Sequence, residues 1–175
     1  SIFGGDPWVS IARGDILRMA DGEIDTTTAL QLFYASTAWG LGAKARRLRT
    51  RLNSLNNDGA PQLLEDAWAA VREGRSPREC YELLLTPKGR GRIYYFGPAF
   101  ATKYLYFASG THDMPRCVIL DAVVAKNLRP LAWPASPTAG WWPETYGRYC
   151  DLLGRWATAL DTTDHPVGPD QIEMA

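Results

Sequence analysis

The 175-residue sequence is poor in residues that bind metals or form cross-links, with three cysteines and two histidines. Cys80, Cys117 and Cys150 are odd in number and widely spaced, and no Cys-x-x-Cys pair occurs. This pattern predicts reduced, buried thiols rather than a disulfide framework. His112 and His165 have no second ligand at metal spacing, so we expect no metal site.

Long apolar runs are also absent. No stretch reaches the roughly 18 consecutive apolar residues of a membrane span. Charged residues, among them Asp6 and Arg13, interrupt the beginning of the chain in a way that is unlike a secretory signal. We therefore expect a cytoplasmic protein with no membrane partner. Because 46% of the residues are hydrophobic and seven are tryptophan, we expect one monomeric domain over residues 1–175 with a sizeable core.

Acidic residues are missing from two segments, 26–57 and 83–112, although the formal net charge of the chain is zero. These two segments hold nine of the nineteen basic residues. The uneven distribution predicts a surface for phosphate groups, with Lys44, Arg46, Arg49 and Arg92 as candidate DNA contacts. A solvated helix face is the alternative interpretation for the first segment.

Capping residues and apolar spacing predict an all-α fold with short connections. Thr26 is expected to cap the first helix, and Ser76 with Pro77 to start a short one, since proline suits the first helical position. The helices are expected over residues 27–38, 42–55, 62–73, 77–84, 98–108, 122–128 and 144–160.

The stretch from Gly97 to residue 107 is the most informative part of the chain. Gly97 and Pro98 predict a turn and a helix start, and among residues 99–108 only Thr102 and Lys103 are not apolar. A lysine on such a buried face, near the start of the helix, can act as a nucleophile when its amine is free. The alternative is that its stem packs on apolar surface while the charge reaches water.

Asp121 follows Lys103 by eighteen residues, after the short apolar run 117–120. Its position predicts an N-cap of the next helix, where its carboxylate would accept backbone N–H bonds. Capping also keeps the side chain ionised, which suits a carboxylate beside a reacting sugar.

The order of a glycine turn, a Thr-Lys pair opening an apolar helix, a short connection and a capping aspartate resembles the helix-hairpin-helix DNA glycosylases, in particular the 8-oxoguanine DNA glycosylases. The resemblance covers roughly residues 27–160, with the hairpin and catalytic segment at about 88–128. It implies an all-α helix-hairpin-helix glycosylase-like fold and excision of a modified purine such as 8-oxoguanine, in base excision repair, from double-stranded DNA. In the family the lysine attacks the sugar C1′ and the aspartate assists departure of the base, which gives both a hydrolase and a lyase activity. Carried over, these residues are Lys103 and Asp121.

The resemblance also implies roles outside this pair. Residues 32–39 resemble the helix that leads into the family's wedge loop, which places Leu41 at the wedge. Phe33 and Trp39 become candidates for the base pocket, and Gly97 and Thr102 for DNA binding at the hairpin. No organic cofactor or iron–sulfur cluster is implied; the family's hairpin adds a carbonyl-bound monovalent cation.

The hairpin departs from the family pattern. The family usually has two glycines close before the lysine, whereas here Gly97 is followed by Pro98 and three further residues before Thr102. If Gly97 corresponds to the second glycine, the lysine position falls on Ala99, and Lys103 lies one helical turn later on the same face. Three alternatives therefore remain: a monofunctional glycosylase in which Asp121 activates water, a non-catalytic DNA-binding module, and a protein-interaction domain that uses the aromatic surface.

Overall fold

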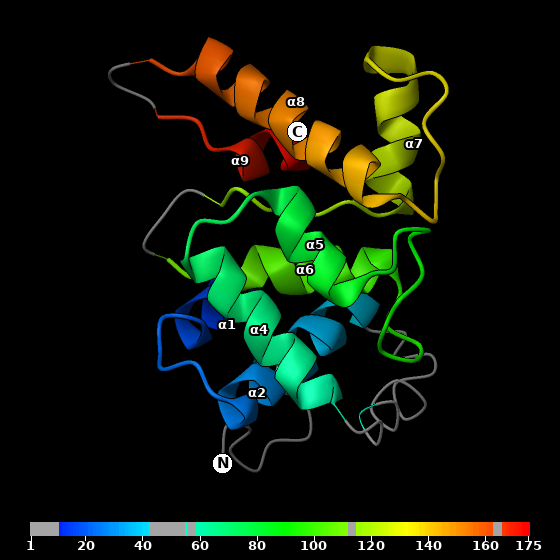
Figure 1. Cartoon of the computed structure of the whole chain (residues 1–175). Helices are drawn as coiled ribbons and strands as arrows, with labels where there is room; N and C mark the ends of the chain where they lie inside the picture. Colours follow the sequence, from blue (N-terminus) through cyan, green and yellow to red (C-terminus); the bar gives the residue numbers. More distant parts are fainter. Residues whose placement is uncertain (1–10, 43–54, 56–58, 112–114, 163–165) are drawn as a thin grey trace.

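The computed structural model describes residues 11–42, 55, 59–111, 115–162 and 166–175, and in these ranges the chain is helical (Figure 1). The prediction of an all-α fold is confirmed, because the described ranges contain no strand, and bridging is limited to single residues such as Leu85 and Gly91. The helices are α1 (Arg13–Met19), α2 (Thr26–Leu41), α4 (Ala60–Arg72), α5 (Pro77–Leu84), α6 (Pro98–Phe107), α7 (Ala122–Leu131), α8 (Pro143–Leu160) and α9 (Pro169–Met174).

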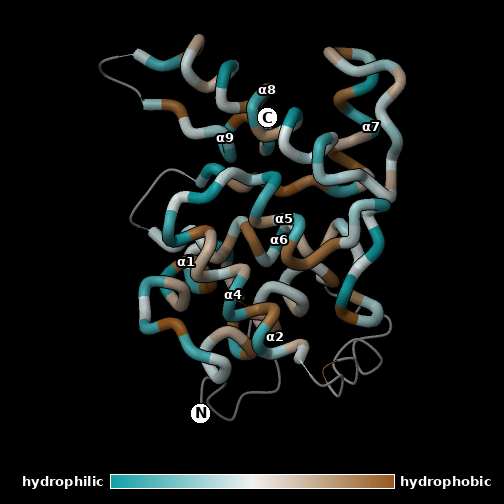
Figure 2. The backbone as a smooth tube through the Cα atoms, in the orientation of Figure 1, coloured by the Kyte–Doolittle hydropathy of each residue, from teal (hydrophilic) through white to brown (hydrophobic). Residues whose placement is uncertain are grey.

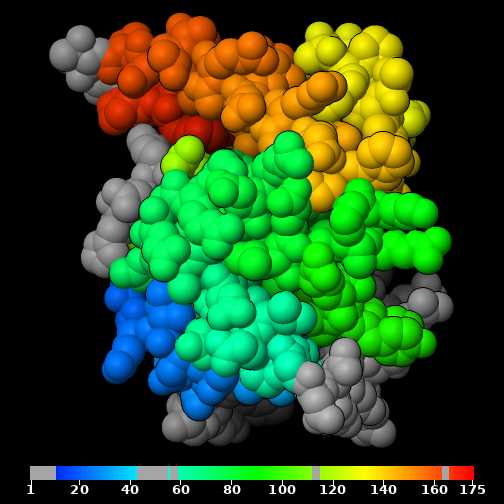
Figure 3. Space-filling view, viewed as in Figure 1, coloured from blue at the N-terminus to red at the C-terminus, as the bar shows by residue number. Residues whose placement is uncertain are grey.

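The helices form two groups, one above the other in Figure 1. Helices α1, α2, α4, α5 and α6 make the larger group, and α7, α8 and α9 lie on one side of it, next to α5 and α6. The space-filling view shows the same division, with the C-terminal helices covering one end of the molecule (Figure 3).

Helix α6 forms the centre of the core. All of its residues from Ala101 to Phe107 are buried, including Thr102 and Lys103. The hydropathy colouring shows hydrophobic segments gathered around this helix, whereas the outer turns are mainly hydrophilic (Figure 2). A buried lysine in such a helix needs a partner, because an unpaired charge in the interior is costly.

One of the predicted helix caps, Ser76, is confirmed, and another, Thr26, is wrong. Ser76 caps α5 by accepting the backbone N–H of Glu79, with Pro77 in the first turn. The cap of α2 is Asp25 rather than Thr26: its carboxylate accepts the N–H of Thr28 at 2.7 Å. Aspartate is the stronger N-cap of the two because it adds a charge that favours the helix N-terminus.

The other helix bounds differ from the prediction by a few residues, and two helices were not predicted. Helix α4 begins at Ala60, α7 extends to Leu131 past Pro130, and α8 begins at Pro143. Helices α1 and α9 lie in segments that gave too few periodic positions to predict them. The helix expected over 42–55 falls largely outside the described residues.

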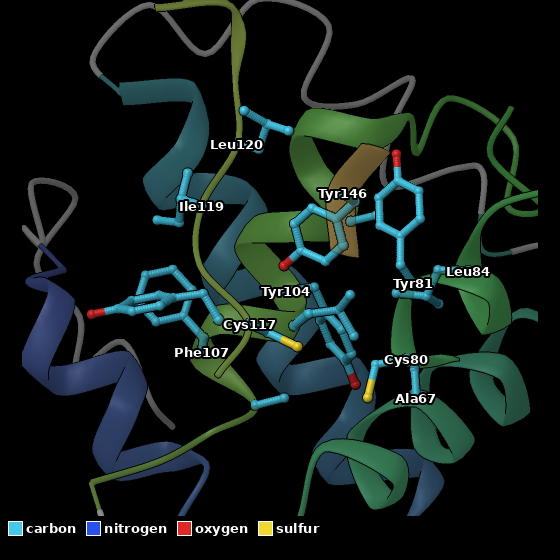
Figure 4. Packing of buried hydrophobic residues seen from close by; sticks show 14 of the residues in the cluster. Ala67, Cys80, Tyr81, Leu84, Tyr104, Phe107, Cys117, Ile119, Leu120 and Tyr146 are labelled. Atoms are coloured by element: carbon cyan, nitrogen blue, oxygen red, sulfur yellow. The ribbon is translucent and has the colours of Figure 1, made fainter. Parts of the chain in front are cut away.

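The three cysteines are free and buried, as predicted. Cys80 on α5 and Cys117, just before the second helix group, lie in the core together with the stacked rings of Tyr81 and Tyr146 (Figure 4). Burial raises the pKa of the Cys150 thiol to about 12, which keeps it protonated and inert. None of the helices in the described ranges has the length and apolarity to cross a bilayer.

Candidate active site

Lys103 and Asp121 form an ion pair between the two helix groups. Lys103 Nζ donates to Asp121 Oδ2 at 2.9 Å, and the side chains are 10% and 28% exposed. The sequence predicted that these residues approach each other, and the structure brings them together. Lys103 lies in the middle of α6, however, and not near its N-terminal end as expected.

The approach of the pair follows from the neighbouring residues. Thr102 precedes Lys103, and its hydroxyl donates to the carbonyl of Leu120 at 3.0 Å and accepts the Leu120 N–H at 3.2 Å. Consecutive residues of α6 therefore contact consecutive residues of the connection, Thr102 with Leu120 and Lys103 with Asp121. This register fixes where the carboxylate lies relative to the amine.

Two tyrosines of α8 hold the same connection from its other side. Tyr146 donates to the Val118 carbonyl at 3.0 Å and Tyr149 to the Ile119 carbonyl at 2.7 Å. Residues 117–120 of this extended connection are at most 2% exposed. Side chains thus provide hydrogen-bond partners for the backbone of three successive buried residues, 118–120, in a segment that belongs to no helix or strand. Buried backbone polar groups require such partners.

Asp121 is the N-cap of α7, as predicted. Its Oδ1 accepts the backbone N–H groups of Val123 at 3.0 Å and Val124 at 3.2 Å, while Oδ2 faces Lys103. Partial burial raises the pKa of the carboxyl, but the hydrogen bond and charge of Lys103 and the two N–H groups outweigh burial and lower the pKa below its usual 3.8. The side chain is therefore ionised at neutral pH.

A cluster of polar and aromatic side chains lies next to this pair, and no pattern in the sequence predicts it. Arg13 of α1 lies over the rings of Trp39, at 5.2 Å, and Tyr106, at 5.1 Å. The Tyr106 hydroxyl accepts from Arg13 Nη1 at 3.3 Å and donates to Asp170 at 3.1 Å. We call these residues, with Glu173, the Arg13 cluster. Its members come from four helices far apart in the chain, so no local pattern could reveal it.

Glu173 connects the Arg13 cluster to the ion pair. Its side chain is 9% exposed, and Oε2 lies 3.7 Å from Arg13 Nη1 without a hydrogen-bond partner. Burial raises the pKa of this carboxyl, the charges of Arg13 and Lys103 oppose the shift, and the charge of Asp121 adds to it. The short helix α9 thus places a third ionisable group, the Glu173 carboxyl, within the electrostatic field of Lys103 and Asp121.

The candidate DNA contacts occupy different environments. Arg92 is exposed, and its Nε donates to the Glu82 carbonyl at 3.2 Å. Leu41 is half-buried at the end of α2, and Thr102 is fully buried. Gly97 is the N-cap of α6 with φ of −83°, so the expected left-handed turn does not occur at this residue. Lys44, Arg46 and Arg49 lie outside the described residues.

The two candidate base-pocket residues also differ. Phe33 is completely buried, with its ring 4.9 Å from that of Phe96, and offers no exposed surface in the unbound protein. Trp39 is half-buried: its ring packs edge-on against Phe107 at 5.2 Å and lies beneath Arg13. Phe107 follows Lys103 by one helical turn on α6, so Trp39 lies on the lysine's side of this helix.

A cavity of about 950 Å³ lies between α7, α8 and α9, and its wall includes Asp121, Tyr149 and Glu173. A second cavity, of about 1090 Å³, contains neither member of the ion pair. In the described ranges no group of three or more histidine, cysteine, aspartate or glutamate side chains is arranged to hold a metal ion.

A helical protein in which a buried lysine of one helix pairs with an aspartate that caps the next helix has the features expected of a helix-hairpin-helix DNA glycosylase. The chain belongs to the family described as "Putative 8-oxoguanine DNA glycosylase OGG-like protein", which it matches over residues 2–175. No curated protein and no solved structure matches it.

Proposed function

We propose that this protein excises a modified purine, such as 8-oxoguanine, from duplex DNA as a bifunctional glycosylase and lyase. The observation that carries the proposal is the 2.9 Å contact between Lys103 and Asp121 in a chain of this family. The pair combines the two groups the reaction needs, an amine and an ionised carboxylate, at the junction of two helix groups.

The chemistry assigns each group a separate task. Once Lys103 has given up a proton, its Nζ attacks the sugar C1′, and the C1′–N bond breaks with its electron pair leaving on the base, which takes up a proton. The charge of Asp121 stabilises the positive charge that develops on the sugar. The resulting N,O-acetal opens to an imine between Lys103 and C1′ as the C1′–O4′ bond breaks and O4′ takes up a proton, and transfer of a C2′ proton to a base then expels the 3′ phosphate.

The site must be entered by a nucleotide turned out of the duplex, which costs a few kcal/mol of unstacking. Trp39 and the Arg13 cluster offer an aromatic ring and hydrogen-bonding groups beside Lys103 for the base. Leu41, two residues after Trp39, would fill the space the base leaves. Arg92 and the N-terminal turn of α6 at Gly97 would contact the backbone, since helix N-termini attract phosphate.

A hairpin-bound monovalent cation would use backbone carbonyls of the loop before α6. The Ile93 carbonyl already accepts the N–H group of Phe96, and the Gly97 carbonyl accepts two, those of Phe100 and Ala101. Because a carbonyl can accept twice, the Ile93 carbonyl keeps capacity for an ion, whereas that of Gly97 is used in full. The proposed reaction has no step that depends on such an ion.

Borohydride trapping on duplexes that carry modified purines tests the proposal, because only an imine intermediate gives a covalent adduct. Lys103→Gln should abolish trapping and strand scission. Asp121→Asn keeps the capping shape and deletes the charge, so it should reduce base release by about 10²-fold or more. Thermal stability and duplex affinity, measured on the same samples, control for misfolding and lost binding.

The alternatives predict different results. A monofunctional glycosylase would release base without trapping, and Lys103→Gln would retain that release. A DNA-binding module would bind duplex with no release by any variant. Activity of Lys103→Gln and Asp121→Asn equal to that of the wild type would contradict the proposed roles of both residues.

A further inference from the structure

Two adjacent tyrosines project from the loop that joins α5 to α6. Tyr94 is 65% and Tyr95 45% exposed, and their rings meet edge-on with centroids 4.1 Å apart. The residues on either side of them are buried, Ile93 at 1% and Phe96 at 3% exposure. The loop therefore anchors itself by its flanking residues and presents the two aromatic rings to the outside.

Backbone hydrogen bonds and close packing fix the conformation of this loop. Arg92 N–H donates to the Leu84 carbonyl at 2.9 Å and Phe96 N–H to the Ile93 carbonyl at 3.1 Å. A Cβ on Gly91 would lie 2.1 Å from the Phe96 carbonyl oxygen, so the chain turns back directly over this glycine. The Phe96 ring packs against Phe33 of α2, which fixes the loop to the core.

Tyr95 takes a backbone conformation that tyrosine disfavours. Its φ is 58°, the only positive value among the non-glycine residues that the structure describes. Non-glycine residues are uncommon in this region, are strained there, and occur mainly where the conformation serves a function. Glycine would fit without strain, so the ring at this position has a purpose that the fold does not require.

The surroundings of the two rings favour nucleic acid as their partner. The exposed charged residues of the loop before the tyrosines are Lys88, Arg90 and Arg92, and no acidic residue occurs in segment 83–112. Cations bind the phosphate backbone, and aromatic rings beside them stack on bases, which is how proteins hold unpaired nucleotides without reading their sequence. The loop also leads directly into α6, which carries Lys103.

We propose that Tyr94 and Tyr95 form a stacking site for DNA bases exposed next to the flipped nucleotide. The inference rests on the DNA-binding part of the proposed function. It adds a second site of contact with the distorted duplex, separate from Leu41. The basic residues of the loop hold the strand by its phosphates, and the tyrosine rings hold the bases that lose their neighbours.

Affinity for a duplex with a central abasic-site analogue tests this site. Tyr94→Ala and Tyr95→Ala should each weaken binding by about 5- to 150-fold, the equivalent of 1–3 kcal/mol per stacked base. The corresponding Phe variants should bind like the wild type, because they keep the ring and lose only the hydroxyl. Leu160→Ala, which removes an equally exposed apolar side chain at the end of α8, should not change affinity.

Tyr95→Gly separates stacking from folding. It relieves the strained backbone, so the midpoint of thermal unfolding should stay the same or rise while DNA affinity falls. The dependence of log K on log salt should keep the wild-type slope in all the tyrosine variants, because no phosphate contact is lost, whereas Arg90→Ala should flatten it by about 1 unit.

The results distinguish the two proposals. Ala variants that bind DNA as well as the wild type would overturn the stacking site, even if the wild type proves to be an active glycosylase. If the wild type releases no base from any duplex but its DNA affinity depends on the two rings, the stacking site stands and the proposed glycosylase function fails.

Discussion

Gly40 of α2 lies directly against the aliphatic stem of Lys103. A Cβ built on Gly40 would be 2.9 Å from Lys103 Cδ and 3.4 Å from Cε, and the ring of Phe100 lies at 3.4 Å on the same side. The glycine thus defines the path of the stem toward Asp121. Lysine side chains are flexible, and here the absence of a side chain on the neighbouring helix gives the stem its space.

Gly40→Ala should therefore impair catalysis more than folding. The added methyl group has to displace the lysine stem, which moves Nζ away from its present position, and misplacement by about 1 Å can cost as much as 10²-fold in rate. We expect single-turnover base release to fall by about 10- to 100-fold with a small change in the unfolding midpoint. Gly154→Ala on α8, where a Cβ meets no atom within 4 Å, is the matched control and should keep full activity.

Tyr149→Phe should destabilise the protein and disturb the site together. The variant keeps the ring but leaves the buried Ile119 carbonyl without its donor, which costs about 1–3 kcal/mol. A chain of this size loses about 2–4 °C in unfolding midpoint per kcal/mol. Because Ile119 lies two residues before Asp121, base release should also fall. Thr158→Val, which removes an exposed hydroxyl hydrogen bond to Gly154, should leave both measurements unchanged.

The lowered pKa of Asp121 predicts how the ion pair responds to acid. A carboxyl whose pKa is lower in the folded state contributes stability above its unfolded pKa and loses that contribution as pH falls through the folded value. The wild type should thus be more stable than Asp121→Asn at pH 7, and the difference should shrink as pH drops below about 4. Chemical denaturation at a series of pH values checks this; a constant difference down to pH 2 would contradict it.

Glu173 should show the opposite sign. Its pKa is raised mainly by burial, so the protonated form suits the fold, and the unfavourable contribution grows as pH rises through the unfolded and then the folded pKa. Glu173→Gln should therefore be more stable than the wild type at pH 7 and equal to it near pH 3. If Glu173→Gln is instead less stable at pH 7, the pairing with Arg13 outweighs the burial of the charge.

The sequence was sufficient for the helical class and for the Lys103–Asp121 pair because both depend on local signals. Apolar spacing predicts α6, and an aspartate after a short apolar run predicts the cap of α7. The distance between Lys103 and Asp121 follows from the contact between Thr102 and Leu120, the residues that precede them. This contact aligns α6 with the connection, so the pair meets once both elements have formed.

The Arg13 cluster and the presented tyrosines could not be predicted in this way. Arg13 and Glu173 are 160 positions apart and meet only because α9, which packs on α8, brings its carboxylates to side chains of α1 and α6. The turn expected at Gly97 occurs instead at Tyr95, which has the positive φ. Nothing in the composition marks a tyrosine for a left-handed backbone conformation, so the sequence could not locate this turn. Base-pocket residues are assembled from several helices, so a spacing rule cannot find them.

Leu41 offers the sharpest test of how the protein opens a duplex. It is the last residue of α2, next to Gly40, which touches the Lys103 stem, and it is followed by Gly42 with φ of 56°. A side chain at this point is one residue from the glycine that touches the lysine stem, which suits a residue that fills the vacated stack. Leu41→Ala should reduce base release from duplex DNA more than from the same strand alone, because the single strand has no stack to fill. Parallel rate measurements on both substrates decide the matter: equal losses would remove Leu41 from the wedge role, while a loss confined to the duplex would place the end of α2 against the opened base pair.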